Sequence, residues 1–167
     1  MTSILGITNE DDIKDLANLA RIIWNEYFPP IIGQLQVDYM VEKFQSEAAI
    51  TNQLQEGYEY FFICDGNERV GYTGLVPNPD KGALQISKFY LLKDARGKGH
   101  GREVITQISD MAVSSGIDQL YLTVNKYNEG AISAYKKLGF RISGDMVLDI
   151  DGGFKMDDYE MTMLLTN

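Results

Sequence analysis

One stretch, residues 84–115, constrains the fold more than any other because three local patterns follow one another without a break. Residues 84–92 are rich in leucyl, β-branched and aromatic side chains and contain no glycine or proline, which predicts a buried strand. Glycines follow at positions 97, 99 and 101. Apolar side chains then recur on one helical face until Gly116, at Val104, Ile105, Ile108, Met111 and Ala112. The stretch therefore predicts a strand, a tight turn and an amphipathic helix.

The glycine turn is a candidate anion site. A helix that begins at about Gly101 directs its first N–H groups and the positive end of its dipole at the turn. Glycines leave that backbone accessible, because they carry no Cβ. Four basic residues lie within ten positions of a chain with net charge −9, namely Lys93, Arg96, Lys98 and Arg102. A local basic cluster in an acidic chain indicates a local anionic ligand, whereas a nucleic-acid-binding protein would be basic overall.

Which anion the turn binds is not given by the glycines alone. No G-x-x-x-x-G-K-[ST] sequence is present, and the glycine spacing is one residue short of the dinucleotide-binding G-x-G-x-x-G. An ordinary tight strand-to-helix connection would also use such a turn.

Two motifs together resemble the GNAT-type N-acetyltransferase family. Arg96-x-x-Gly99-x-Gly101 after an apolar strand resembles that family's acetyl-CoA pyrophosphate loop. Further along, Asn128, Ala131, Tyr135 and Gly139-Phe140 resemble its N-x-x-A-x-x-x-Y-x-x-x-G-F segment. The resemblance covers roughly residues 58–165 well and the N-terminal third loosely. It extends, loosely, to bacterial polyamine (spermidine/spermine) acetyltransferases through residues 154–161.

The resemblance implies an α/β fold: a mixed, mostly antiparallel sheet of about seven strands with about four to five helices. Its central parallel strand pair would be splayed at the acetyl-CoA site. Strands are expected at 3–8, 58–65, 69–76, 84–92, 119–125, 140–150 and 155–165. Helices are expected from Thr8 or Asn9 to Pro29-Pro30, and at 34–44, 46–56, about 101–115 and 128–138. Without repeats, linkers or low-complexity tracts, residues 1–167 are expected to form a single acetyltransferase domain.

The resemblance also implies acetyl-CoA as the acetyl donor and assigns site residues. The cofactor-binding residues would be Phe89, Tyr90, Leu91, Arg96, Gly97, Lys98, Gly99, His100, Gly101, Arg102, Asn128, Ala131 and Tyr135. Among them, the Leu91 amide would stabilise the oxyanion, and the Tyr135 phenol would protonate the leaving sulfur. Tyr135 could instead pack against the sheet, and Asn128 could act as a helix N-cap as well as a cofactor contact.

The acceptor side of the reaction is less defined. Several relatives carry a strand glutamate as general base where this chain has Ser87, so Glu26, Tyr58, Tyr72 and Asp157 are candidates, and no base at all is needed if the neutral amine binds. Substrate contacts are predicted at Trp24, Glu26, Tyr27 and Asp157, although the aromatic pair could instead pack in the core. Residues 145–160 carry six acidic side chains and one lysine, which would favour a cationic amine or form a solvated hairpin.

Composition limits the remaining possibilities. A chain of 167 residues with 44% hydrophobic content suits one compact core, and no apolar run is long enough to cross a bilayer. Cys64 is the only cysteine, so a reducing, cytoplasmic location and a buried inert thiol are expected. No spacing predicts a metal site, and no nucleic-acid or membrane partner is expected, while a homodimer is left open.

Three functions follow from these observations. The first is an N-acetyltransferase that acts on a small cationic amine. The second is acetylation of a protein N-terminus or lysine. The third is a non-catalytic acyl-CoA-binding module, which the presence of Tyr135 disfavours.

Overall fold

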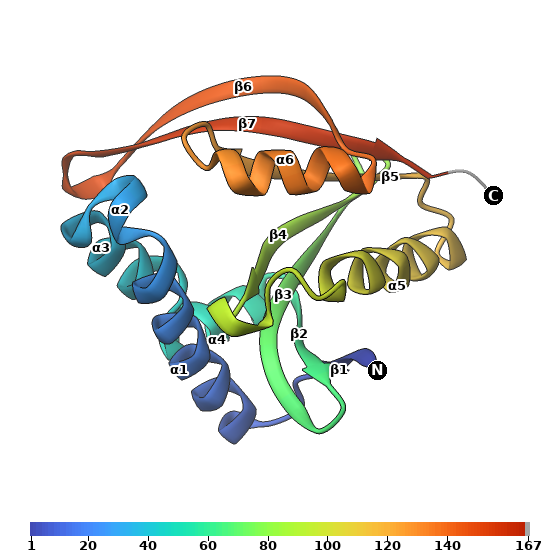
Figure 1. Ribbon diagram of the computed structural model, residues 1–167, viewed down its shortest axis with the longest axis horizontal. Coiled ribbons are helices and arrows are strands. Elements are labelled where there is room, and N and C mark those ends of the chain that lie inside the picture. The colour runs from blue at the N-terminus through green and yellow to red at the C-terminus, as the bar shows by residue number, and fades with distance from the viewer. Residues whose placement is uncertain (166–167) are drawn as a thin grey trace. The chain divides into compact units, whose positions relative to one another are not determined.

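The computed structural model describes residues 1–165, apart from the side chain of residue 151 (Figure 1). In chain order the elements are β1 (Thr2–Gly6), α1 (Glu10–Tyr27), α2 (Pro29–Ile32), α3 (Gln34–Phe44), α4 (Glu47–Gln55), β2 (Glu59–Asp65), β3 (Glu68–Asn78), β4 (Ala83–Leu91), η1 (Lys93–Ala95), α5 (His100–Ser114), β5 (Gln119–Asn125), α6 (Glu129–Leu138), β6 (Arg141–Ile150), η2 (Asp151–Gly153) and β7 (Phe154–Leu164). The strands are hydrogen bonded in the order β1-β2-β3-β4-β5-β7-β6. The pairs β1–β2, β2–β3, β5–β7 and β6–β7 are antiparallel, and β4–β5 is parallel.

The chain divides into two compact units, and β4 contributes to both. The first unit contains residues 1–76 and 88–104, with strands β1 to β3, the end of β4 and helices α1 to α4. The second unit contains residues 77–87 and those from 105 onward, with the start of β4, most of α5, β5, α6 and the β6–β7 hairpin.

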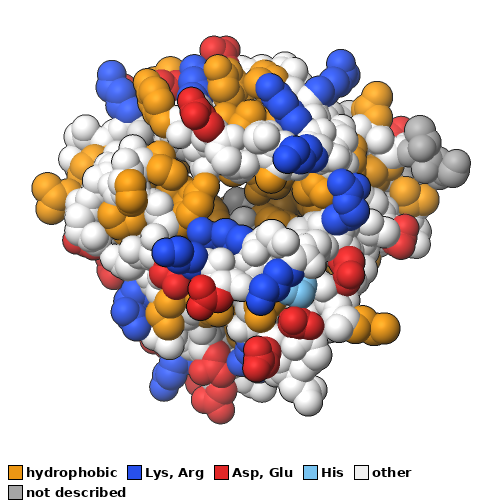
Figure 2. Space-filling model, in the orientation of Figure 1, with side chains coloured by type: hydrophobic (Ala, Val, Ile, Leu, Met, Phe, Trp, Pro, Cys, Tyr) orange, Lys and Arg blue, Asp and Glu red, His pale blue; other side chains and the backbone are white. Residues whose placement is uncertain are grey.

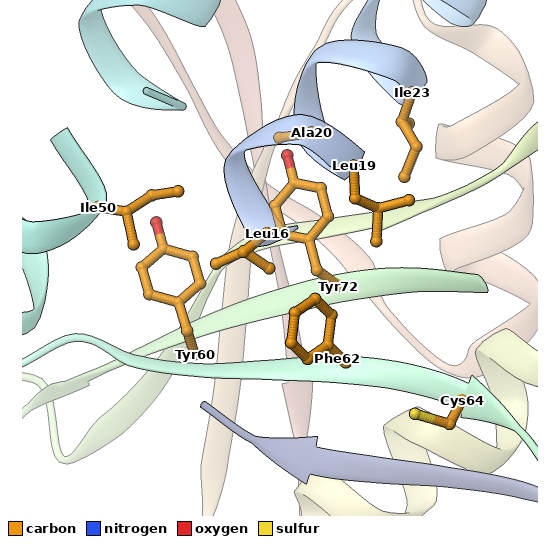
Figure 3. Close-up of a cluster of buried hydrophobic side chains, with 9 residues drawn as sticks. All are labelled: Leu16, Leu19, Ala20, Ile23, Ile50, Tyr60, Phe62, Cys64 and Tyr72. Carbon is orange, nitrogen blue, oxygen red and sulfur yellow. The ribbon is translucent and has the colours of Figure 1, made fainter. Parts of the chain in front are cut away.

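The core of the first unit lies between α1 and the strands β2 and β3. Helix α1 buries one stripe of side chains, Leu16, Leu19, Ala20, Ile23 and Trp24, at the spacing of an amphipathic helix. Figure 3 shows the first four of them beside Tyr60, Phe62 and Tyr72 from the strands. Cys64 is buried in the same cluster, and burial raises the pKa of its thiol, as an inert core cysteine requires.

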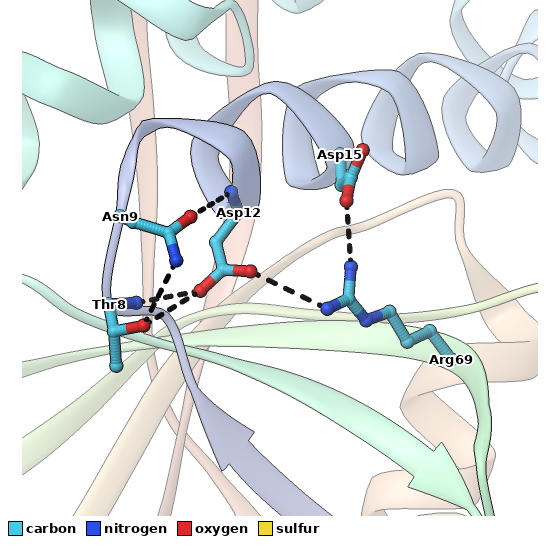
Figure 4. A network of polar contacts seen from close by, with 5 residues as sticks. All are labelled: Thr8, Asn9, Asp12, Asp15 and Arg69. Carbon is cyan, nitrogen blue, oxygen red and sulfur yellow. Dashed lines mark hydrogen bonds and ion pairs between the residues drawn. The ribbon is translucent and has the colours of Figure 1, made fainter.

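Polar contacts fix the start of α1. The Asn9 side chain caps the helix by accepting from the Asp12 N–H, 2.9 Å away. The Asp12 carboxylate in turn accepts from the backbone N–H of Thr8, which holds the pKa of Asp12 below its usual value. Arg69 on β3 reaches both Asp12 and Asp15, at 3.5 and 3.0 Å (Figure 4). The helix is therefore tied to the sheet at its N-terminal end.

In the second unit β7 is the central strand of a three-stranded antiparallel group. It pairs with β5 from Leu164 to Asp158, opposite Gln119 to Asn125, and with β6 along the whole hairpin. The side chains of Leu120, Leu122 and Met161 are almost fully buried on one face. Helix α6 covers that face, because the Cβ position of Gly139, its C-cap, lies 3.2 Å from the Met163 sulfur.

The seven predicted strands and five longer helices are confirmed, with ends shifted by at most two residues. The short helix α2 was not predicted, so the described residues contain six α-helices rather than four or five. Pro29 and Pro30 end α1, as expected, but they also begin α2, because proline lacks only an N–H that the first helical turn leaves unpaired. Gly33, with φ of 84°, closes that turn.

The described residues include no helix with the length and hydrophobicity needed to span a bilayer. Acidic and basic side chains are interspersed on the face drawn in Figure 2, without a single continuous basic surface.

Candidate active site

The predicted anion loop is present in the first unit as a turn between β4 and α5. After Leu91 the chain forms η1 and then reverses through Gly97 and Gly99, whose φ angles are 74° and 86°. Only glycine adopts these angles without strain. A Cβ placed on either residue would meet nothing within 4 Å, so a ligand can approach this backbone closely. The N–H groups of His100 and Gly101 open α5 and have no acceptor within the helix. The turn thus fits a bound phosphate.

Arg96 fixes the turn to the end of β4. Its guanidinium donates two hydrogen bonds to the Leu91 carbonyl, at 3.2 and 2.9 Å, and lies 4.3 Å from the centre of the Tyr27 ring. These contacts bring together three residues that the sequence assigned separately. A direct contact of Arg96 or of the Leu91 amide with the cofactor stays a prediction.

The His100 side chain points away from the turn and is buried against β1. Its Nδ1 lies 2.7 Å from the Thr2 hydroxyl, and its Nε2 lies 3.7 Å from an Asp65 oxygen. Glu103 accepts from the Thr2 N–H at 3.2 Å, which adds a second link between β1 and the first turn of α5. At His100, therefore, the backbone N–H is the group suited to a cofactor. Lys98 on the turn and Arg102 in the first turn of α5 are both exposed.

The last residues of β4 are held by close backbone packing. The Tyr90 carbonyl passes so near Gly71 on β3 that a Cβ there would lie 2.3 Å from its oxygen. The Leu92 N–H donates to the Val70 carbonyl at 2.8 Å. The Phe89 ring lies at van der Waals distance, 4.0 Å, from the Cβ position of Gly101. Because Gly71 has no Cβ, the backbone of Tyr90 and Leu91 can lie this close to β3.

The predicted acceptor contacts of α1 divide into core and surface residues. Trp24 is buried, stacks on Phe28 with ring centres 4.2 Å apart and meets the Tyr90 ring edge-on at 5.4 Å. Tyr27 is half-buried beneath Arg96. Glu26 accepts from the Lys93 N–H at 3.1 Å and so caps η1. Trp24 thus has the core role that the sequence left open, and substrate contacts of these residues stay predictions.

Tyr72 is a poor candidate for the general base. It is fully buried, donates to Gln45 at 2.7 Å and accepts from the Trp24 indole N–H at 3.3 Å. Burial raises its pKa well above the usual tyrosine value. The phenolate is therefore strongly disfavoured near neutral pH.

Lys88 is a functional candidate that sequence reasoning missed. Its side chain is only 5% exposed, and its amine donates to the Phe44 carbonyl and to Gln53 Oε1, 3.1 Å away. Tyr60 donates to the same Gln53 oxygen at 2.5 Å. Burial lowers the pKa of Lys88 to about 7. The sequence contained part of the signal, because Lys88 lies on the same strand face as the apolar side chains of Ile86 and Tyr90.

We expect the folding stability of the wild-type protein to rise between pH 7 and about pH 10 through Lys88. The unfolded lysine keeps its proton up to about 10.4, whereas the folded one loses it near 7, so the unfolded state binds more protons in this interval. A Lys88→Met variant lacks this contribution. Thermal unfolding of both proteins over this pH range should show that the Tm of the wild type, relative to that of the variant, increases with pH. A Tm difference that does not change with pH would contradict the lowered pKa of Lys88.

In the second unit, the predicted cofactor motif forms the start and middle of α6. The Asn128 side chain accepts from the Ala131 N–H at 3.3 Å, so it does act as an N-cap. Tyr135 is half-buried, and its ring meets Phe140 edge-on with centres 5.7 Å apart. Gly139 ends the helix with φ of 111°. The proposed roles of Asn128, Ala131 and Tyr135 toward the cofactor stay predictions.

Asp157 and Asp158 lie on opposite faces of β7 and differ in environment. Asp157 forms an ion pair with Lys126 at 2.8 Å. Asp158 is 6% exposed, and no hydrogen bond or ion pair with a described residue engages its carboxylate. Burial first, and then the charge of Asp157, raise the pKa of Asp158 to about 6. Sequence analysis selected Asp157, but in the structure the carboxylate with the raised pKa is that of Asp158.

Within residues 1–165 no cluster of three or more histidine, cysteine, aspartate or glutamate side chains is arranged to hold a metal ion.

Comparison with known proteins defines the class. The sequence model of the acetyltransferase (GNAT) family matches residues 17–140, and the chain belongs to this family. It is therefore an N-acetyltransferase that uses acetyl-CoA. An uncharacterized N-acetyltransferase of Mycobacterium tuberculosis is 26% identical over 151 residues, which cover 90% of this chain and 96% of that protein.

Solved structures show the same fold. The PaiA N-acetyltransferase of Thermoplasma acidophilum, in complex with coenzyme A, has a TM-score of 0.78 and 18% identity, over 98% of this chain and 99% of that one. A spermidine N-acetyltransferase SpeG chimera of the Vibrio cholerae and hSSAT proteins has a TM-score of 0.68 and 18% identity, over 98% and 95% of the two chains.

Proposed function

We propose that this enzyme transfers the acetyl group of acetyl-CoA to a primary amine of a small cationic metabolite of the polyamine class. The observation that carries the proposal is the charge of residues 145–160, where six carboxylates accompany one lysine. Carboxylates attract cationic amines and raise their local concentration. The similarity in fold to a spermidine N-acetyltransferase chimera agrees with this acceptor class.

Acetyl-CoA supplies an acetyl group activated as a thioester. In this proposal, the N–H groups at the start of α5 hold the pyrophosphate, and the Leu91 amide donates to the carbonyl oxygen as negative charge develops there. Tyr135 donates the proton that the departing sulfur requires. Asn128 and Ala131 orient the pantetheine arm. The whole chain is proposed to act as a single acetyltransferase domain.

A protein N-terminus or lysine is the second candidate acceptor, and a panel of acceptors separates the two. Thiol release from acetyl-CoA should be measured with polyamines, amino acids, aminoglycosides and peptides. We expect kcat/KM for spermidine or spermine to exceed that for every peptide by at least about tenfold, which is roughly 1.4 kcal/mol of transition-state binding. A peptide with the highest kcat/KM would reject the proposal, and binding of acetyl-CoA without turnover of any amine would indicate a non-catalytic module.

A further inference from the structure

The Asp158 carboxylate is buried without hydrogen-bond donors from the described residues, an environment that is unfavourable for an ionised side chain. An ionised carboxylate taken out of water is strongly destabilising unless charges or hydrogen-bond donors compensate it. Asp158 is only 6% exposed, its carboxylate accepts no hydrogen bond from residues 1–165, and the charge of Lys126 compensates its burial only in part, because the pKa is still raised. By contrast, Asp145 and Asp157 both pair with Lys126, at 3.3 and 2.8 Å. Fold stability therefore gives no reason for an aspartate at position 158.

The position of Asp158 in the second unit is equally specific. Its Cα partner on β5 is Asn125, the last residue of that strand, and its partner on β6 is Met146. Asn128, which caps α6, follows Asn125 by three residues. Asp158 thus lies beside the strand end that leads into the cofactor motif of α6.

Asp158 and α6 lie on opposite faces of this part of the sheet. Met161 and Met163 project toward the α6 face, as the contact between Gly139 and Met163 shows. Side chains alternate along a strand, so Asp158 projects to the other face. In thioester aminolysis the incoming nitrogen and the departing sulfur also occupy different positions around the carbonyl carbon. An acid on α6 and a proton acceptor on the other face of β7 suit this requirement.

We propose that Asp158 is the catalytic residue that accepts the proton of the acceptor amine. The proposal rests on the proposed function and extends it to the general base. The neutral amine nitrogen forms the new C–N bond to the acetyl carbon, the C–S bond breaks, and the surplus proton on nitrogen moves to Asp158. The sulfur takes a proton from Tyr135, and the Asp158 proton then returns, directly or through solvent, to the tyrosine. The sum is amine plus acetyl-CoA giving amide plus free thiol.

Of the four other candidate bases, Tyr58 stacks its ring on Tyr60 with centres 6.1 Å apart, and the remaining three are engaged by polar partners in ways that Asp158 is not. Glu26 accepts from the Lys93 N–H, Asp157 pairs with Lys126, and Tyr72 is buried in a hydrogen-bonded pair. A carboxylate with a pKa of about 6 is ionised at neutral pH and is closer in basicity to an amine than an exposed aspartate is. The charged groups that reach Asp158 are Asp157, which raises the pKa, and Lys126, which lowers it.

Asp158→Asn tests the proposal with any amine that the wild-type enzyme accepts. We expect kcat at pH 8 to fall at least about 100-fold with acetyl-CoA affinity unchanged, which is the lower range for general acid–base catalysis. The ratio of wild-type to variant kcat should shrink below pH 6, where wild-type Asp158 is protonated. The ionisation of the amine itself cancels in that ratio. Asp110→Asn on α5, an exposed aspartate, is the matched control and should keep wild-type kinetics.

A stability measurement tests the environment of Asp158 without using activity. A folded pKa above the unfolded one means that the folded state binds more protons between about pH 4 and pH 6, so wild-type stability falls as pH rises through this interval. Asp158→Asn should therefore raise Tm at pH 8 and change it little at pH 4. An unchanged Tm at pH 8 would contradict the buried, unpaired carboxylate.

The outcomes separate this proposal from the proposed function. Wild-type turnover of peptides alone would reject the polyamine class and leave Asp158 to be tested with those peptides. Unchanged kcat, or a rise in KM with unchanged kcat and pH profile, would overturn the role of Asp158. If the asparagine variant does not fold, Asp158→Glu is the second test: it should lower kcat but keep the fall in kcat at acidic pH. A glutamate variant whose kcat does not fall at acidic pH would also overturn the role of Asp158.

Discussion

Gly99→Val should reduce acetyl-CoA affinity by about 100-fold or more. Position 99 has φ of 86°, which a β-branched residue adopts only with strain, and the valine side chain would occupy the open space above the turn. If two charge-assisted hydrogen bonds to the pyrophosphate are lost at about 1.5 kcal/mol each, the loss is about 3 kcal/mol, or roughly 100-fold. Isothermal titration calorimetry with coenzyme A measures this directly.

Gly116→Val provides the matched control for Gly99→Val. Gly116 lies just beyond the other end of α5 with φ of 78°, and its Cβ position is also free of neighbours within 4 Å. The two substitutions therefore impose the same kind of backbone strain and should lower Tm to a similar degree. Only the valine at position 99 should alter coenzyme A binding. Equal affinity losses in both variants, or normal affinity with Gly99→Val, would reject the placement of the pyrophosphate.

Local sequence patterns predicted most of the fold because each element carries its own signal. Three local signals each specify a conformation without reference to distant residues: the apolar run of residues 84–92 without glycine or proline, the glycines at 97 and 99, and the apolar face of α5. The short helix α2 was missed because a proline pair is compatible both with the end of one helix and with the start of another.

The candidate site was less predictable from the sequence, because the unusual properties of Lys88 and Asp158 arise from burial in the folded protein. The strand pattern puts Lys88 on an apolar face, but the burial of its amine depends on Phe44 and Gln53, which come from α3 and α4. Asp158 could not be separated from Asp157 by composition, since both are aspartates in one acidic segment. The two side chains project to opposite faces of β7, so Asp157 forms an ion pair with Lys126 whereas Asp158 is buried.

Tyr135→Phe should lower kcat by about 100- to 1,000-fold while acetyl-CoA affinity stays nearly unchanged. The substitution removes only the hydroxyl, which is the proposed proton donor to sulfur, and general acid catalysis contributes about 10²–10⁴-fold. The edge-on contact with Phe140 at 5.7 Å involves the ring and should persist in the variant. Thiol release under saturating acetyl-CoA measures kcat, and calorimetry measures the affinity.

Tyr127→Phe is the control for the loss of a tyrosine hydroxyl in the same part of the chain. Tyr127 is 70% exposed and immediately precedes Asn128, the cap of α6, so the variant reports any general sensitivity of this segment. It should keep wild-type kcat and KM. A Tyr135→Phe enzyme with full kcat would remove Tyr135 from the mechanism, because thiolate departure would then need no acid. A variant that loses affinity and kcat together would make Tyr135 a binding residue, since an interaction made equally in the ground and transition states changes binding rather than the chemical step.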